Sequence, residues 1–76
     1  MSRQTVVYKY ADRPLAEVLV DGTWWPAEIR MWVQHNDGTW TADVGYSMAP
    51  AENRFGTFPA DRLRAPGGAA LEAGRE

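Results

Sequence analysis

The sequence contains no cysteine, so neither a disulfide nor a thiolate metal site is available to stabilise the chain. No apolar run approaches the roughly 20 residues of a membrane-spanning helix, and the N-terminus lacks the apolar stretch of a signal peptide. We therefore expect a cytoplasmic protein. Positive charge is also scarce: eight lysines and arginines stand against ten acidic residues. The net charge of −2 argues against a nonspecific DNA-binding protein.

The residue sets of common active sites are missing as well. The sequence shows no Ser-His-Asp or Cys-His constellation, no glycine-rich phosphate loop and no HExxH motif. Its one histidine, His35, lies beside a turn without a second ligand at a metal-binding spacing, so we expect it to be solvated. Asp21 and Asp37 are predicted to be turn residues rather than a carboxylate pair. We therefore predict that the chain is not an enzyme and that it binds no metal or cofactor.

Aromatic residues are plentiful: four tryptophans, three tyrosines and two phenylalanines among 76 residues. A domain this small buries only about 60% of the surface that its unfolded chain exposes, so it needs bulky side chains to build a core. Arginine outnumbers the single lysine, Lys9, and alanine, glycine and proline are frequent. This composition indicates a high-GC bacterial genome.

The pair Asp21-Gly22 predicts the tight turn of a first β-hairpin. With a two-residue turn, Val18 lies opposite Trp25, and Leu19 lies opposite Trp24. The first pair belongs to an apolar face that also contains Ile29. The second pair belongs to the opposite face of the strands.

The pair Asp37-Gly38 predicts the turn of a second hairpin. With a two-residue turn, the apolar faces of its two strands coincide. A three-residue loop would put these faces on opposite sides unless a bulge restored the phase, so a two- or four-residue connection is favoured. The resulting pairs are Val33–Ala42, Met31–Val44 and Ile29–Tyr46. The core residues predicted on this shared face are Trp25, Trp40, Ile29, Met31, Val44 and Tyr46.

The remaining segments complete an all-β domain. Residues 6–10 are predicted to form a first strand, and residues 56–64 a short strand broken by Pro59 and a turn that returns Leu63 to the core. Five short strands with long hairpins close most easily into a small barrel over residues 6–64. Residues 1–5 are expected to be flexible. Residues 65–76 are expected to form a disordered tail or a short helix at 69–73.

Part of the chain resembles Tudor domains. "DGTWWPAEI" (residues 21–29) is similar to their second strand, "ADVGY" (42–46) to their third strand, and "ADRLR" (60–64) to their closing turn. The resemblance implies a five-stranded SH3-like (Tudor-like) barrel. It also implies that Trp25 and Tyr46 are two walls of an aromatic cage that holds methylated lysine or arginine.

The chain also resembles Src-homology-3 domains, which are SH3-like barrels too. The shared features are the opening "VVYKY", the Trp-Trp pair and the closing "GTFP". This resemblance implies that Trp24 packs on polyproline ligands, with Tyr8 and Tyr10 as further groove aromatics and Pro59 as a floor residue. The chain is also similar to short uncharacterised actinobacterial proteins.

The face opposite the predicted core carries Trp24, Trp32 and Leu19, together with Arg30. Two interpretations stay open: the N-terminal strand or the tail covers these side chains, or they form an exposed aromatic patch. A large exposed patch on a soluble protein indicates a binding surface. We therefore expect a non-catalytic protein-interaction module or small accessory subunit that binds a protein or peptide through this patch. Homodimerisation through the patch is an alternative. The full predicted set is Trp24, Trp32, Leu19, Tyr8, Tyr10 and Arg30.

A second candidate surface is basic. Arg54, Arg62 and Arg64 are predicted to cluster near the end of the barrel with Phe55 and Phe58. Small barrels bind nucleic acid through such edges, where bases stack on aromatic rings. Nucleic-acid binding at this edge is the alternative function.

Overall fold

The structure is a computed structural model, which describes residues 4–74. Over this range the chain is all-β, with one antiparallel sheet and two short 3₁₀ turns. No helix among these residues has the length and apolar character needed to cross a membrane. The elements are β1 (Thr5–Val7), η1 (Tyr10–Asp12), β2 (Leu15–Val20), β3 (Thr23–Gln34), β4 (Trp40–Tyr46), β5 (Arg54–Pro59), η2 (Ala60–Arg62) and β6 (Leu63–Arg64).

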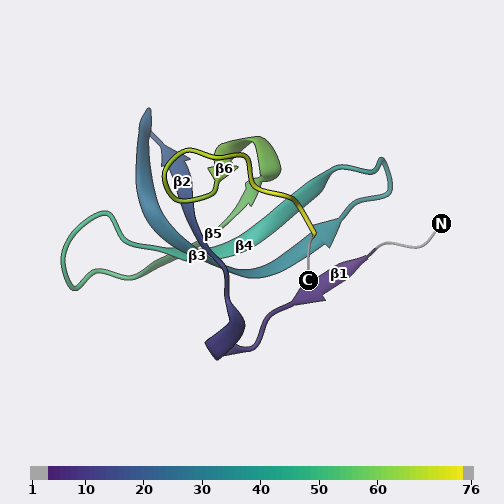
Figure 1. Ribbon diagram of the computed structural model, residues 1–76, viewed down its shortest axis with the longest axis horizontal. Helices are drawn as coiled ribbons and strands as arrows, with labels where there is room; N and C mark the ends of the chain where they lie inside the picture. Colours follow the sequence, from purple (N-terminus) through teal and green to yellow (C-terminus); the bar gives the residue numbers. More distant parts are fainter. Residues whose placement is uncertain (1–3, 75–76) are drawn as a thin grey trace.

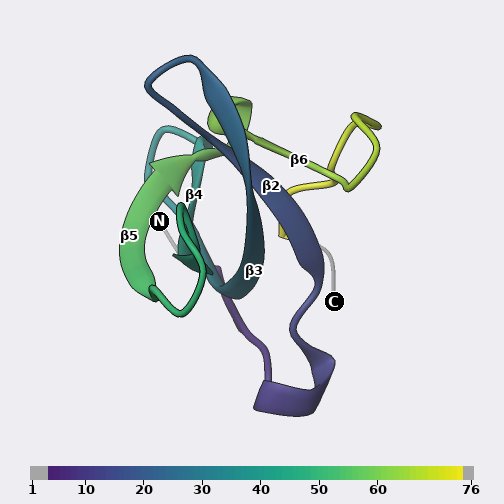
Figure 2. The same cartoon turned by 90° about the vertical axis from the view of Figure 1, so that its left-hand side faces the viewer.

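The twelve-residue strand β3 organises the sheet, whose order is β5-β4-β3-β2-β6 (Figure 1). The first half of β3 pairs with β2 and the second half with β1, while β4 pairs along its other edge. The strands are strongly curved, and the turn η2 links β5 and β6 at the two ends of this order (Figure 2).

The all-β prediction is confirmed, but the closed five-stranded barrel is not. The sheet has six strands and stays open, since no pairing joins β5 to β6 within residues 4–74. The segment predicted as one broken strand is divided at Pro59, which ends β5, and by η2. Because β5 pairs with β4 and β6 pairs with β2, the two pieces count as separate strands. The first of them also begins earlier than predicted, at Arg54.

The first hairpin has the predicted register. Asp21 and Gly22 both have positive φ angles, 52° and 78°, which a two-residue hairpin turn of this hand requires. Val18 pairs with Trp25, and Leu19 with Trp24, as expected from the turn.

The second hairpin does not have the predicted register, because its loop has three residues and β3 contains a β-bulge ahead of the loop. The loop is closed by a hydrogen bond from the His35 N–H to the Thr39 carbonyl, 2.8 Å, and Gly38 has a φ of 89°. The register shifts by one residue between Ile29 and Met31, at Arg30. The bulge thus restores the phase that the loop alone would have lost. The observed pairs are Val33–Thr41, Trp32–Ala42, Met31–Asp43 and Ile29–Val44.

This shift exchanges the faces of residues 31–33. Trp32 is only 1% exposed, so its predicted place in an outer patch is wrong. Met31 pairs with Asp43 and is not part of the core cluster, so its predicted place in the core is wrong too. The small side chain of Ala42, opposite Trp32, leaves room for the indole ring.

The core lies on the concave face of the sheet. Small residues alternate there with large ones, so that the tryptophan and the branched side chains fit together. Leu63 belongs to it, which confirms that the turn after Pro59 returns this side chain to the core. The buried members are Val6, Ala16, Val18, Ala27, Ile29, Trp32, Ala42, Val44 and Leu63.

Both ends of the described chain differ from expectation. The first strand is shorter than the predicted 6–10, since β1 ends at Val7 and Tyr10 begins η1. Over residues 65–74 the chain forms turns rather than the short helix considered for 69–73. Leu71 and Ala73 pack against the core. Of the segment predicted to be flexible, 1–5, and of the predicted tail, 65–76, residues 1–3 and 75–76 lie outside the described residues.

The turn of the second hairpin makes stability depend on pH. The Asp37 carboxylate accepts hydrogen bonds from the Thr39 hydroxyl, 2.7 Å, and from the Thr39 N–H, 3.0 Å. These hydrogen bonds lower the pKa of Asp37 below its usual value of 3.8, and the bond from the Thr39 hydroxyl has the largest effect. A carboxylate with a lowered pKa in the folded state stabilises the fold above its unfolded pKa, and this contribution is lost as the pH falls through the folded pKa.

We therefore expect Asp37→Asn to be less stable than wild type at pH 6, and this difference to shrink below a pH of about 4. The amide keeps the shape and one acceptor, so the comparison isolates the charge. Urea midpoints of both chains between pH 6 and pH 2.5 measure it. A difference that is the same at both ends of this range would contradict the role given to the carboxylate.

Candidate functional site

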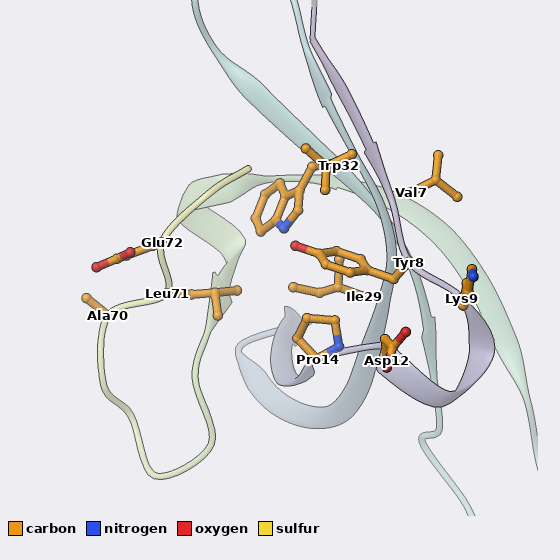
Figure 3. A pocket seen from close by; sticks show the side chains of 11 residues that line it. Val7, Tyr8, Lys9, Asp12, Pro14, Ile29, Trp32, Ala70, Leu71 and Glu72 are labelled. Carbon is orange, nitrogen blue, oxygen red and sulfur yellow. The ribbon is translucent and has the colours of Figure 1, made fainter. Parts of the chain in front are cut away.

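A cavity of about 740 Å³ lies between the N-terminal segment, the concave face of the sheet and the C-terminal tail (Figure 3). It forms because the chain bows away from the sheet between two anchor points on neighbouring residues of β3. The Tyr8 N–H donates to the Arg30 carbonyl, 3.1 Å, and the Ile29 N–H donates to the Pro14 carbonyl, 2.9 Å. Between these anchors the η1 turn is closed by a hydrogen bond from the Asp12 N–H to the Lys9 carbonyl, 2.8 Å.

The walls of the cavity are apolar and aromatic, and charged residues complete its lining. The Trp32 ring is held edge-on against Trp40, with ring centres 6.3 Å apart and planes at 88°. Figure 3 shows Tyr8, Trp32 and Ile29 on one side and Leu71 on the other. An apolar hollow with a few polar groups is the usual form of a small binding site. The lining residues are Val6, Val7, Tyr8, Lys9, Asp12, Pro14, Ile29, Trp32, Ala70, Leu71 and Glu72.

The predicted aromatic patch is divided by the fold. Trp24 and Leu19 do pair on the outer face, as expected. The Arg64 guanidinium covers the Trp24 ring, with its Cζ 4.2 Å from the ring centre, and its Nε donates to Glu17 at 2.6 Å. Trp24 is therefore part of a local cation–π and ion-pair cluster rather than the centre of a wide patch.

The other members of the predicted patch lie elsewhere. Tyr8 packs against the core and lines the cavity. Tyr10 is 80% exposed on η1, where the Arg13 guanidinium lies 5.0 Å from its ring centre. Arg30, at the bulge, lies over the ring of Phe55 at 4.9 Å. The six residues thus form no single patch. Leu19 and Trp24 lie together on the outer face, Tyr8 and the buried Trp32 line the cavity, and Tyr10 and Arg30 lie elsewhere.

The two residues assigned to an aromatic cage by resemblance pack against the core. The Trp25 indole N–H donates to the Val20 carbonyl at 3.3 Å. The Tyr46 ring meets Phe58 edge-on, with ring centres 5.6 Å apart. Both rings therefore have structural contacts within the domain.

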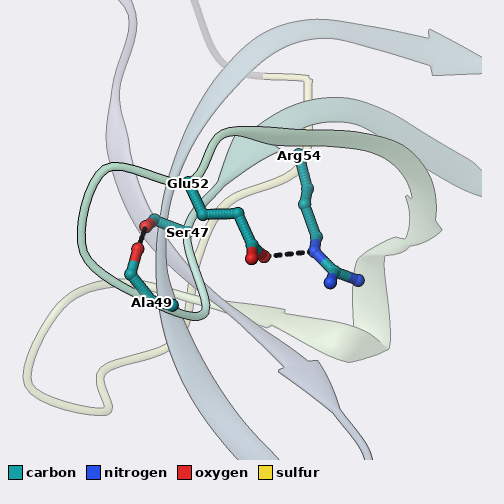
Figure 4. A network of polar contacts seen from close by, with 4 residues as sticks. All are labelled: Ser47, Ala49, Glu52 and Arg54. Atoms are coloured by element: carbon teal, nitrogen blue, oxygen red, sulfur yellow. Dashed lines mark hydrogen bonds and ion pairs between the residues drawn. The ribbon is translucent and has the colours of Figure 1, made fainter.

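The predicted basic edge is largely neutralised. Arg54 donates to the Glu52 carboxylate (Figure 4), and this hydrogen bond, together with the negative charge of Glu52, raises the pKa of the Arg54 guanidinium. Arg64 is paired with Glu17. Arg62 is exposed on η2, and Phe55, also exposed, has Arg30 rather than Arg62 over its ring. Paired arginines attract phosphate less than free ones, so this edge supports nucleic-acid binding weakly.

Metal-ligating side chains do not gather in residues 4–74: no group of three histidine or acidic residues is placed to hold an ion. The His35 Nε2 lies 2.9 Å from the Thr41 hydroxyl, which ties the imidazole to the base of the second hairpin.

Several cavity residues carry no signal in the sequence. The sequence predicts a turn around Asp12 and Pro14 and a tail around Leu71. Only the fold brings these residues to one cavity. One hint exists for Leu71, since it is the single large apolar residue in a tail of alanine and glycine.

Comparisons of this chain with protein-family models, with curated proteins and with solved structures found no match.

Proposed function

We propose that this chain is a non-catalytic module that binds a protein partner, and that it does so by accepting an apolar side chain of an extended peptide in the cavity beside β1 and β3. The observation that carries the proposal is the composition of the cavity, with aromatic and aliphatic walls and charged residues beside them. Such a site recognises an apolar anchor and leaves the flanking backbone near polar groups.

The position of the cavity supports a peptide as ligand. It lies at the surface between segments that are far apart in the sequence, and its volume of about 740 Å³ exceeds that of one side chain. The outer cluster of Trp24 and Arg64 favours this function less, because the guanidinium already covers the ring.

The finer assignments made from the sequence stay predictions. They are an SH3-like relationship, a bacterial origin and a cytoplasmic location. The order of β2 to β6, with a 3₁₀ turn between the last two strands, supports the first of them.

Panning a display library of random ten-residue peptides against the full chain tests the proposal. We expect enrichment of peptides with a large apolar residue. Their affinity should fall at least about tenfold with Tyr8→Ser, because this substitution removes one apolar contact between the cavity and the peptide. Affinities are measured by fluorescence anisotropy, and circular dichroism verifies that each variant is folded.

Two controls make this experiment specific. Tyr10→Ser changes an exposed tyrosine two residues away and should leave the affinity unchanged. Trp24→Ser removes the ring of the outer cluster. If the peptides lose affinity with Trp24→Ser or Tyr10→Ser and keep it with Tyr8→Ser, the outer surface is the binding site and the cavity is not.

A further inference from the structure

The tail doubles back over the cavity because its sequence contains a tight turn. The Gly68 N–H donates to the Ala65 carbonyl at 3.0 Å, and the Ala65 N–H donates to the Ala69 carbonyl at 2.9 Å. Gly67 and Gly68 have φ angles of 88° and 93°, which residues with a side chain rarely adopt. The turn sends residues 70–74 back along the concave side of the sheet, as seen in the yellow end of the ribbon (Figures 1 and 2).

Leu71 is the side chain that the tail brings to the cavity. In Figure 3 it points from the tail toward Trp32, Tyr8 and Ile29. It is partly buried and packs against the core, as does Ala73. Leu71 lines the cavity from the side of the tail, so it covers part of the apolar surface that the anchor of a bound peptide would contact.

The end of the tail lies close to Trp40, the ring that packs edge-on against Trp32. A Cβ added to Gly74 would lie 2.4 to 2.8 Å from three atoms of the Trp40 ring, so only glycine fits there without movement. The residues on either side of Leu71–Glu72 are alanines, which keep the chain narrow. The tail therefore has the chemistry of a ligand: one large apolar side chain, small neighbours and an adjacent carboxylate.

We propose that residues 69–74 are an internal ligand of the cavity, and that the external ligand is an extended peptide of the same chemistry, with a leucine-like residue between small residues, which binds by displacing the tail. This inference rests on the proposed function, since it names the ligand class and the regulation of the same site. A tail that occupies the cavity for about 90–99% of the time raises the apparent Kd of an external peptide about 10- to 100-fold.

The test uses the full chain and a synthetic peptide with the sequence of residues 65–74. Binding is followed by ¹⁵N–¹H NMR titration of wild type, Leu71→Ser and Gly74→Ala. We expect both variants to bind the peptide about tenfold or more tightly than wild type, because each removes one contact that holds the tail. Signals of Tyr8 and Trp32 should move on binding, and the Leu71→Ser tail should show shifts of an unstructured chain. Leu15→Ser, at a leucine that is 70% exposed, is the matched control and should bind as wild type does.

The outcomes separate this inference from the function on which it rests. If wild type and both variants bind the peptide with equal affinity at Tyr8 and Trp32, the cavity binds peptides but the tail does not compete, and the inference is wrong. If the variants release the tail and none of the chains binds the peptide, the tail is not a ligand, and the inference is again wrong. The proposed function is then decided by the peptides from the display library and their response to Tyr8→Ser.

Discussion

Trp32→Ala should lower the free energy of unfolding by about 3–5 kcal/mol, the usual result of emptying the site of a buried aromatic side chain. The indole ring is 1% exposed, lies opposite Ala42 and meets Trp40 edge-on. Its partner across the strands is an alanine, so the cross-strand neighbour is too small to fill the volume that the ring leaves. A domain of this length is stable by only about 4–11 kcal/mol, so the substitution should remove a large share of its stability.

Urea denaturation followed by circular dichroism measures this effect, and Trp24→Ala is the matched control. Trp24 lies on the outer face, half-exposed under Arg64, and its loss should lower the free energy of unfolding by about 1 kcal/mol, mostly through the cation–π contact. Equal effects of the two substitutions would show that Trp32 is not the buried one. That result would favour the register in which the loop has two residues.

Leu63→Ala should have the second largest effect, a loss of about 2–5 kcal/mol in the free energy of unfolding. Leu63 is 5% exposed, and it is the residue through which the two-residue strand β6 reaches the core. Leu63 pairs with Val18 of β2, so its side chain holds β6, the strand that follows η2, at the edge of the sheet. Without this anchor, β6 has one further pair with β2, between Arg64 and Glu17.

The control is Leu15→Ala, the same chemical change at a leucine that is 70% exposed, which should alter stability by no more than about 0.5 kcal/mol. Thermal and urea unfolding of both variants give the comparison. Losing β6 would also uncover an edge of β2, so Leu63→Ala should aggregate more readily on heating. If the two leucine variants unfold at the same midpoint, β6 does not hold the sheet together in the way described.

The first hairpin was predictable because its turn leaves little freedom. A two-residue turn needs two positive φ angles, Asp-Gly provides them, and the pairing of Val18 with Trp25 follows directly. The second hairpin contains the same dipeptide in a three-residue loop. The amino-acid sequence alone does not show that one Asp-Gly pair forms a two-residue loop and the other belongs to a three-residue loop.

The candidate site was harder to predict than the fold. The bulge at Arg30 compensates for the longer loop, so Ile29 and Val44 keep the predicted core face while Trp32 changes sides. The cavity joins η1, β3 and the tail, and Leu71 lines it together with residues more than 35 positions away in the chain. Periodicity describes neighbours along a strand and carries no information about such contacts. The division of the aromatic residues between core and surface depended on one extra residue in β3.

The bulge at Arg30 and the three-residue loop also decide where the chain tolerates insertions and deletions. Removing one residue at either place leaves the pairing of β3 with β4 as it is, because neither extra residue belongs to a pair. Removing a residue elsewhere in these two strands would turn the apolar side of the following segment toward solvent. A deletion at Arg30 also has a cost of its own, since its carbonyl accepts the hydrogen bond from Tyr8. Length changes within the central hairpin should therefore be found mainly in its loop, where the sheet and the cavity are both left intact.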